Sequence, residues 1–146
     1  MKAKNELNEV AIDGRTPLMA AAAEGSLAAV EKLVQNGASV HVTGHRQMTP
    51  LHEAAANGEP LVVNYLLSLG AKVDAKTSDG ATPLMCAAAW GNLEVAKLLL
   101  AHGADRTKID SRGATAADIA HEKGEENTAE LINSYPDPNP PASAPR

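Results

Sequence analysis

The chain repeats itself every 33 residues, and this period constrains its fold more than any other feature. The motif TPL occurs in phase as Thr16-Pro17-Leu18, Thr49-Pro50-Leu51 and Thr82-Pro83-Leu84, and Thr115 is next in phase. A glycine follows each threonine nine positions later, at Gly25, Gly58, Gly91 and Gly124. A fixed period of this length is typical of supersecondary units that stack and bury their apolar faces only against neighbours. We therefore expect a repeat solenoid.

Each unit reads as two short helices separated by the periodic glycine, which is suited to the positive φ that ends a helix. Threonine before proline is a helix start signal, because the hydroxyl can cap and proline at the first helical position loses no needed N–H. The first helix is rich in alanine, which lets neighbouring first helices approach closely. The second helix carries larger apolar residues at i, i+3 and i+4. They are Val30, Leu33, Val34, Val63, Leu66, Leu67, Val95, Leu98, Leu99 and Leu100. The pattern predicts an all-α solenoid.

The third repeat, from Asp79-Gly80-Ala81-Thr82-Pro83-Leu84 through Gly103-Ala104, resembles an ankyrin repeat. The segment Thr49-Pro50-Leu51-His52-Glu53-Ala54-Ala55 is similar to the TPLHxAA signature of that family. The resemblance covers residues 7 to 133. It implies stacked ankyrin helix–turn–helix units joined by β-hairpin-like loops, which bind another protein and carry out no chemistry. It also implies that His52 has a structural role, hydrogen bonding between repeats.

The repeat pattern divides the chain into three parts. We expect a lead-in or partial capping unit at residues 1–12, a repeat domain at 13–133 and a Pro-rich disordered tail at 134–146. The four repeats run approximately over residues 11–43, 44–76, 77–109 and 110–133. In the last repeat Glu126 and Asn133 replace leucines, which is typical of a terminal repeat with a polar outer face. Gln47 replaces the loop glycine of the other repeats, so we expect that loop to be distorted.

Composition and charge narrow the class of partner. The net charge is −5 and the pI is about 5.5, which argues against nucleic acid or an anionic membrane as the main partner. A single cysteine, Cys86, rules out an internal disulfide and is usual in a reducing compartment. We expect a cytoplasmic protein, with the nucleus as an additional location, and a monomer.

The residues that could carry chemistry form no catalytic pattern. A zinc site needs matched Cys and His ligands, and only one cysteine is available for five histidines. Cys86 lies on a first helix with no basic neighbour in sequence to lower its pKa, which favours an inert thiol. We expect no enzyme activity, no cofactor and no metal.

The resemblance implies that a partner would bind the concave surface of the repeats, made of the loop tips and the exposed edge of each first helix. On this chain the predicted partner-binding residues are Trp90, Met48, Arg46, His45, Asp79, Arg15, Glu24, Asn57 and Arg112. Trp90 is the only tryptophan, and its register equivalents Glu24, Asn57 and Lys123 are polar, so we expect the indole to be exposed. Exposed aromatics beside Arg and Met are typical of interface hot spots.

The leading functional hypothesis is a non-catalytic adaptor, scaffold or inhibitor that binds one cytosolic protein. The alternatives are a regulatory or targeting subunit of an enzyme complex, and an ankyrin fragment of a larger scaffold or receptor protein. The residues leave these alternatives open.

Overall fold

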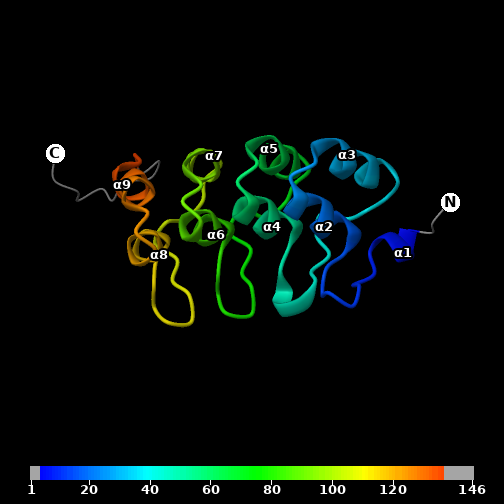
Figure 1. Ribbon diagram of the computed structural model, residues 1–146, viewed down its shortest axis with the longest axis horizontal. Helices are drawn as coiled ribbons and strands as arrows, with labels where there is room; N and C mark the ends of the chain where they lie inside the picture. The colour runs from blue at the N-terminus through cyan, green and yellow to red at the C-terminus, as the bar shows by residue number, and fades with distance from the viewer. Residues whose placement is uncertain (1–3, 137–146) are drawn as a thin grey trace.

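The helices of this computed structural model, which describes residues 4–136, form two parallel layers (Figure 1). The first helix of each repeat belongs to the inner layer and the second to the outer layer. The inner helices are α2 (Pro17–Glu24), α4 (Pro50–Asn57), α6 (Pro83–Ala89) and α8 (Ala116–Glu122). The outer helices are α3 (Leu27–Gln35), α5 (Pro60–Ser68), α7 (Leu93–Ala101) and α9 (Glu126–Ser134). A short helix α1 (Lys4–Leu7) precedes them, and the predicted all-α solenoid is confirmed.

The inner helices begin and end where the repeated motif predicts. Thr16, Thr49, Thr82 and Thr115 are the N-caps, and each side chain accepts a hydrogen bond from the backbone N–H three residues later. After α4, Gly58 takes a left-handed conformation with φ of 84°. A Cβ at Gly58 would also lie 2.7 Å from the Asn92 side chain of the next repeat. Glycine is therefore required there both by the turn and by the close approach of the following repeat.

The core is a continuous apolar layer between neighbouring repeats. The inner helices contact one another through the periodic alanines, which are all buried: Ala21, Ala54, Ala87 and Ala120. The outer helices add larger side chains that are completely buried, among them Val30, Val63, Leu66, Val95 and Leu99. Each repeat therefore completes its core only by packing against the repeat beside it.

His52 joins the second repeat to the third. Its Nδ1 accepts a hydrogen bond from the Thr49 backbone N–H at 3.2 Å, so the ring proton is on Nε2. That Nε2 lies 2.9 Å from the Ala81 carbonyl oxygen, to which it donates. The side chain is fully buried, and desolvation by this burial lowers the pKa of His52 below its ordinary value of 6.5. The histidine therefore acts as a neutral hydrogen-bonding bridge between repeats, as the resemblance implies.

Each loop that precedes an inner helix is closed in the manner of a β-hairpin, although no strand occurs between residues 4 and 136. The backbone N–H at one register position donates to the carbonyl four residues later in all four loops. The bonds are Ala11 to Arg15, Gly44 to Met48, Thr77 to Ala81 and Asp110 to Ala114, at 2.8 to 3.0 Å. The second loop differs, because Arg46 and Gln47 both have φ of 59° and the short 3₁₀ helix His45–Gln47 forms there. This is the distortion expected from the loss of the loop glycine.

The two ends of the stack are finished by polar contacts. At the N-terminal end Leu7 is buried, and the Asn8 Oδ1 accepts a hydrogen bond from the Ser39 N–H at 2.8 Å. At the C-terminal end the Arg106 guanidinium donates to the Ile132 carbonyl at 2.9 Å. Helix α9 ends at Ser134, and residues 137–146 of the predicted tail lie outside the described residues, so the tail assignment stays a prediction.

We expect Leu66→Ala to lower the free energy of unfolding by about 2–5 kcal/mol, because it leaves a cavity in a completely buried part of the core. Leu61 lies on the same helix but is 63% exposed, so Leu61→Ala is the matched control and should stay within about 0.5 kcal/mol of wild type. Urea denaturation of both variants measures the difference. Equal stability of the two variants would contradict the assignment of Leu66 to the core.

We expect the free energy of unfolding to fall as the pH is lowered from about 7 to about 5.5, because the unfolded chain then binds a proton on residue 52 more readily than the folded chain. His121 acts in the opposite direction: hydrogen bonding to Glu126 raises its pKa, so its contribution is present at low pH and is lost as the pH rises. Denaturant titrations of His121→Gln across this range isolate the His52 effect. A pH-independent stability of this variant would contradict the neutral buried histidine.

Candidate functional site

The four loops form one continuous surface because neighbouring loops are hydrogen-bonded to each other. The His45 N–H donates to the Gly14 carbonyl at 2.7 Å, and the Ser78 N–H donates to the Arg46 carbonyl at 2.8 Å. The Ser111 N–H donates to the Asp79 carbonyl, also at 2.8 Å. These bonds fix the relative positions of residues that lie about one repeat apart, so the loop tips present a defined row of side chains.

Two polar residues that sequence reasoning missed hold the third and fourth loops closed. The Thr77 hydroxyl oxygen accepts a hydrogen bond from the Ala81 N–H at 3.1 Å. At the same register, the Asp110 carboxylate accepts from the N–H groups of Ala114 (3.0 Å) and Arg112 (2.9 Å). Partial desolvation opposes ionisation of Asp110, but these donors and the Arg112 guanidinium hold its pKa below the ordinary value. The sequence signal for these two residues is their register position: Thr77 and Asp110 carry a side-chain hydrogen-bond acceptor where the first two loops have Ala11 and Gly44.

The three predicted arginines are all engaged in ion pairs within the chain. Arg15 reaches across to the next repeat, where its Nε and Nη2 lie 3.3 and 3.2 Å from the carboxylate oxygens of Glu53. Glu53 is only 8% exposed, and sequence reasoning did not select it. This bidentate pair therefore has a rigid geometry and fixes the Arg15 side chain against the inner helix α4.

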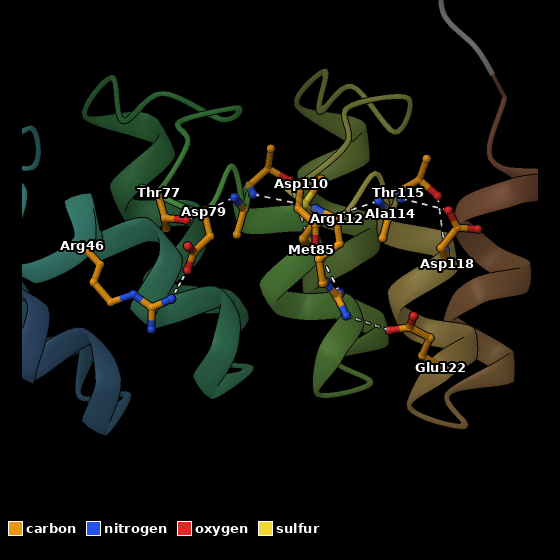
Figure 2. Close-up of polar contacts among 12 residues, drawn as sticks. Arg46, Thr77, Asp79, Met85, Asp110, Arg112, Ala114, Thr115, Asp118 and Glu122 are labelled. Atoms are coloured by element: carbon orange, nitrogen blue, oxygen red, sulfur yellow. Dashed lines mark hydrogen bonds and ion pairs between the residues drawn. The ribbon is translucent and has the colours of Figure 1, made fainter.

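Arg46 and Arg112 are paired along the row of loop tips (Figure 2). Arg46 contacts the carboxylate of Asp79, its equivalent in the next repeat, so two of the predicted residues are brought together. Arg112 lies between Asp110 at 3.2 Å and Glu122 at 3.4 Å. The register position of Arg46 is held by residues of alternating charge, Asp13, Arg46, Asp79 and Arg112. The Arg46–Asp79 contact shows that part of this pattern is satisfied inside the chain.

Trp90 is the most distinctive apolar side chain of the surface. It follows the last residue of the inner helix α6 and is 69% exposed, as its register predicts. Glu24 is exposed at the equivalent place in the first repeat, whereas the Asn57 Nδ2 donates to the Ala23 carbonyl at 2.6 Å. Asn57 therefore links two repeats as well as lining the surface. His45 is exposed at the second loop tip, and Met48 is half-buried beside it.

Other side-chain chemistry is limited in the described residues. Between residues 4 and 136 no three His, Cys, Asp or Glu residues are grouped in a way that could hold a metal ion. No helix in this range is long and apolar enough to cross a membrane. Burial raises the pKa of the Cys86 thiol to about 12, and the nearby Glu53 carboxylate adds to the shift. This thiol is therefore a poor nucleophile at neutral pH.

Comparison with known proteins is consistent with this geometry. A family model described as ankyrin repeats (three copies) matches residues 1–77 and residues 72–142, and the two matches together span most of the chain. A search among curated proteins finds no match.

We expect Cys86 to react at least about tenfold more slowly with iodoacetamide at pH 8 in the folded protein than in the unfolded chain. Burial raises the pKa of the thiol to about 12 and so reduces the thiolate fraction, and the greater intrinsic nucleophilicity of a more basic thiolate offsets only part of this loss. The alkylation is stopped at a series of times and the modified fraction is measured by mass spectrometry, in buffer and in guanidinium chloride, which gives the ratio of the two rates. Comparable rates in the two states would show that the thiol is accessible and ionised, contrary to its position in the structure.

Proposed function

The chain belongs to the ankyrin repeat family, whose members are generally protein–protein interaction modules, and we propose that it is a non-catalytic adaptor, scaffold or inhibitor. In this proposal it binds a cytosolic protein through the concave surface, defined by the loop tips and the exposed ends of α2, α4, α6 and α8. Solenoids commonly use such extended surfaces for binding.

The observation that carries this proposal is the exposure of Trp90 at the end of an inner helix. An indole exposed to water on a layer otherwise edged by Glu24, Asn57 and Lys123 contributes nothing to the core of its own repeat. Tryptophan is enriched among the residues that dominate binding energy at interfaces, since it buries a large area when a partner covers it. We therefore place the centre of the interface at Trp90.

The ion pairs of the surface suggest that its charged and apolar side chains have different roles in binding. Arg15, Arg46 and Arg112 already have carboxylate partners, so a protein that binds here must compete with those partners to recruit them. Two of the pairs, Arg46–Asp79 and Arg112–Glu122, join side chains that are both exposed, and such pairs contribute about 0–1 kcal/mol each. We infer that Trp90 and Met48 supply most of the affinity, whereas the charged side chains select the orientation of the partner.

We expect Trp90→Ala to weaken partner binding by about 2 kcal/mol or more while leaving the fold intact, because the side chain is 69% exposed and lies outside the core. Leu61→Ala is the matched control, since it removes a comparably exposed apolar side chain from the outer layer. Isothermal titration of a captured partner gives the affinities, and thermal melts verify the fold. Unchanged affinity of the Trp90 variant would move the interface elsewhere.

The partner itself is found by affinity capture from native lysate with wild type, Trp90→Ala/Met48→Ala and Leu61→Ala as baits. We expect one protein to be retained by wild type and by the Leu61 variant and lost from the double variant. Equal capture by all three baits would contradict binding at the concave surface.

A further inference from the structure

A groove of about 360 Å³ lies between the segments that follow α3 and α5, and it shares no residue with the predicted partner-binding set. Its polar lining is made of His41, Thr43, Gln47, Thr49, Lys72 and Lys76. Both lysines are exposed, no ion pair involves either of them in the described part of the chain, and no carboxylate lines the groove. A positive groove of this kind is unusual on a chain with a net charge of −5.

The repeat structure provides an internal comparison, because the same groove positions occur at the neighbouring junctions. The four positions held here by His41, Thr43, Lys72 and Lys76 are Asp74, Lys76, Asp105 and Ile109 one repeat later. One repeat earlier they are Asn8, Val10, Ser39 and Thr43. With histidine neutral, the formal charge of the four positions is therefore +2 at the middle junction, −1 at the following one and zero at the preceding one.

Among the described residues, the middle junction also lacks a hydrogen bond that both neighbours have. The Ser39 N–H donates to the Asn8 Oδ1 at 2.8 Å, and the Asp105 N–H donates to the Asp74 Oδ1 at 3.0 Å. By register the middle pair is the Lys72 N–H and residue 41, which is a histidine. Within residues 4–136 the Lys72 N–H has no acceptor. Lys72, whose backbone N–H has no acceptor among residues 4–136, therefore lines the same groove as Lys76, and neither lysine has an ion-pair partner in that range.

Gln47 adds a third departure from the repeat. The other loops have Gly14, Gly80 and Gly113 at this position. Gln47 has a left-handed φ of 59°, which strains the backbone of a residue with a Cβ and would not strain glycine. Gln47 lines the groove, and neither its side-chain amide nor the Thr43 hydroxyl has a hydrogen-bond partner among the described residues. Strained residues that persist in a fold are often kept for a local function.

We propose that this groove is a binding site for an oxyanion of the phosphate class. Lys72 and Lys76 balance the two negative charges of a phosphate monoester, and charge-assisted hydrogen bonds of this kind are the strong ones. The Lys72 N–H donates to one phosphate oxygen in place of the missing side-chain oxygen at position 41. Thr43 and Gln47 supply the remaining donors. The anion is either free in solution or carried on a phosphorylated side chain of a peptide.

The first test is a ¹H–¹⁵N correlation titration with inorganic phosphate at constant ionic strength. We expect a saturable shift of the Lys72 amide, with the amides of Ser39 and Asp105 unmoved because they are already bonded internally. Lys72→Met/Lys76→Met should weaken binding at least tenfold. Lys97→Met/Lys108→Met removes the same charge away from the groove and should retain wild-type affinity. Equal loss in both double variants, or equal shifts of all three amides, would reduce the effect to general charge and overturn the site.

A second variant tests the unpaired donor without removing a charge from the lysines. His41→Asn restores the amide oxygen that Asn8 presents to Ser39, so it should occupy the Lys72 N–H internally. We expect phosphate affinity to fall several-fold while the melting temperature does not fall. Wild-type phosphate affinity in this variant would contradict the role of the Lys72 N–H.

The source of the anion is distinguished by titrating a short peptide with one phosphoserine and the same peptide without phosphate. Tighter binding of the phosphopeptide than of inorganic phosphate would assign the site to a phosphorylated segment, and equal affinity would assign it to a free anion. No shift of the Lys72 amide with phosphate or with phosphopeptide would overturn the proposal. These experiments are independent of Trp90, so their failure leaves the proposed protein interaction untouched.

Discussion

The close packing of the inner helices through their alanine faces is the interaction on which the rest of the structure depends. A methyl group at Ala21, Ala54, Ala87 and Ala120 lets adjacent backbones approach, and a larger residue there would force the repeats apart. At this spacing the His52 ring reaches the Ala81 carbonyl, and the second, third and fourth loops each donate a hydrogen bond to the loop before it. The row of loop tips is thus a consequence of core packing.

That surface combines rigidity with one conspicuous apolar feature. Arg15, Arg46 and Arg112 are held by carboxylates on the same or the following repeat, which orders long side chains before any partner arrives. Pre-ordered side chains lose less conformational entropy on binding. Trp90, by contrast, is an exposed apolar side chain, and covering it would remove a large apolar area from water. The two features together describe a preformed platform with an apolar centre.

Four departures from the repeat meet at one junction. His41, Gln47, Lys72 and Lys76 all differ from their register equivalents, and all four line the same groove. At these positions the repeat loses local consistency: Gln47 has a left-handed φ, and the Lys72 N–H has no acceptor among the described residues. Concentrated inconsistency of this kind is expected where a site has been added to a fold.

The period and the TPL motif by themselves determined the solenoid, the starts of the inner helices, the buried alanines and the exposure of Trp90. These features follow from local helix capping and from the register of the repeat, both of which depend only on the order of residues along the chain. Only the tertiary structure decided that Arg15 pairs with Glu53, that Arg46 pairs with Asp79, and that the Lys72 N–H has no acceptor among residues 4–136. The physical reason is that register places a residue beside its equivalent, whereas side-chain direction and backbone hydrogen bonding depend on how two loops, separated by a whole repeat, meet in space.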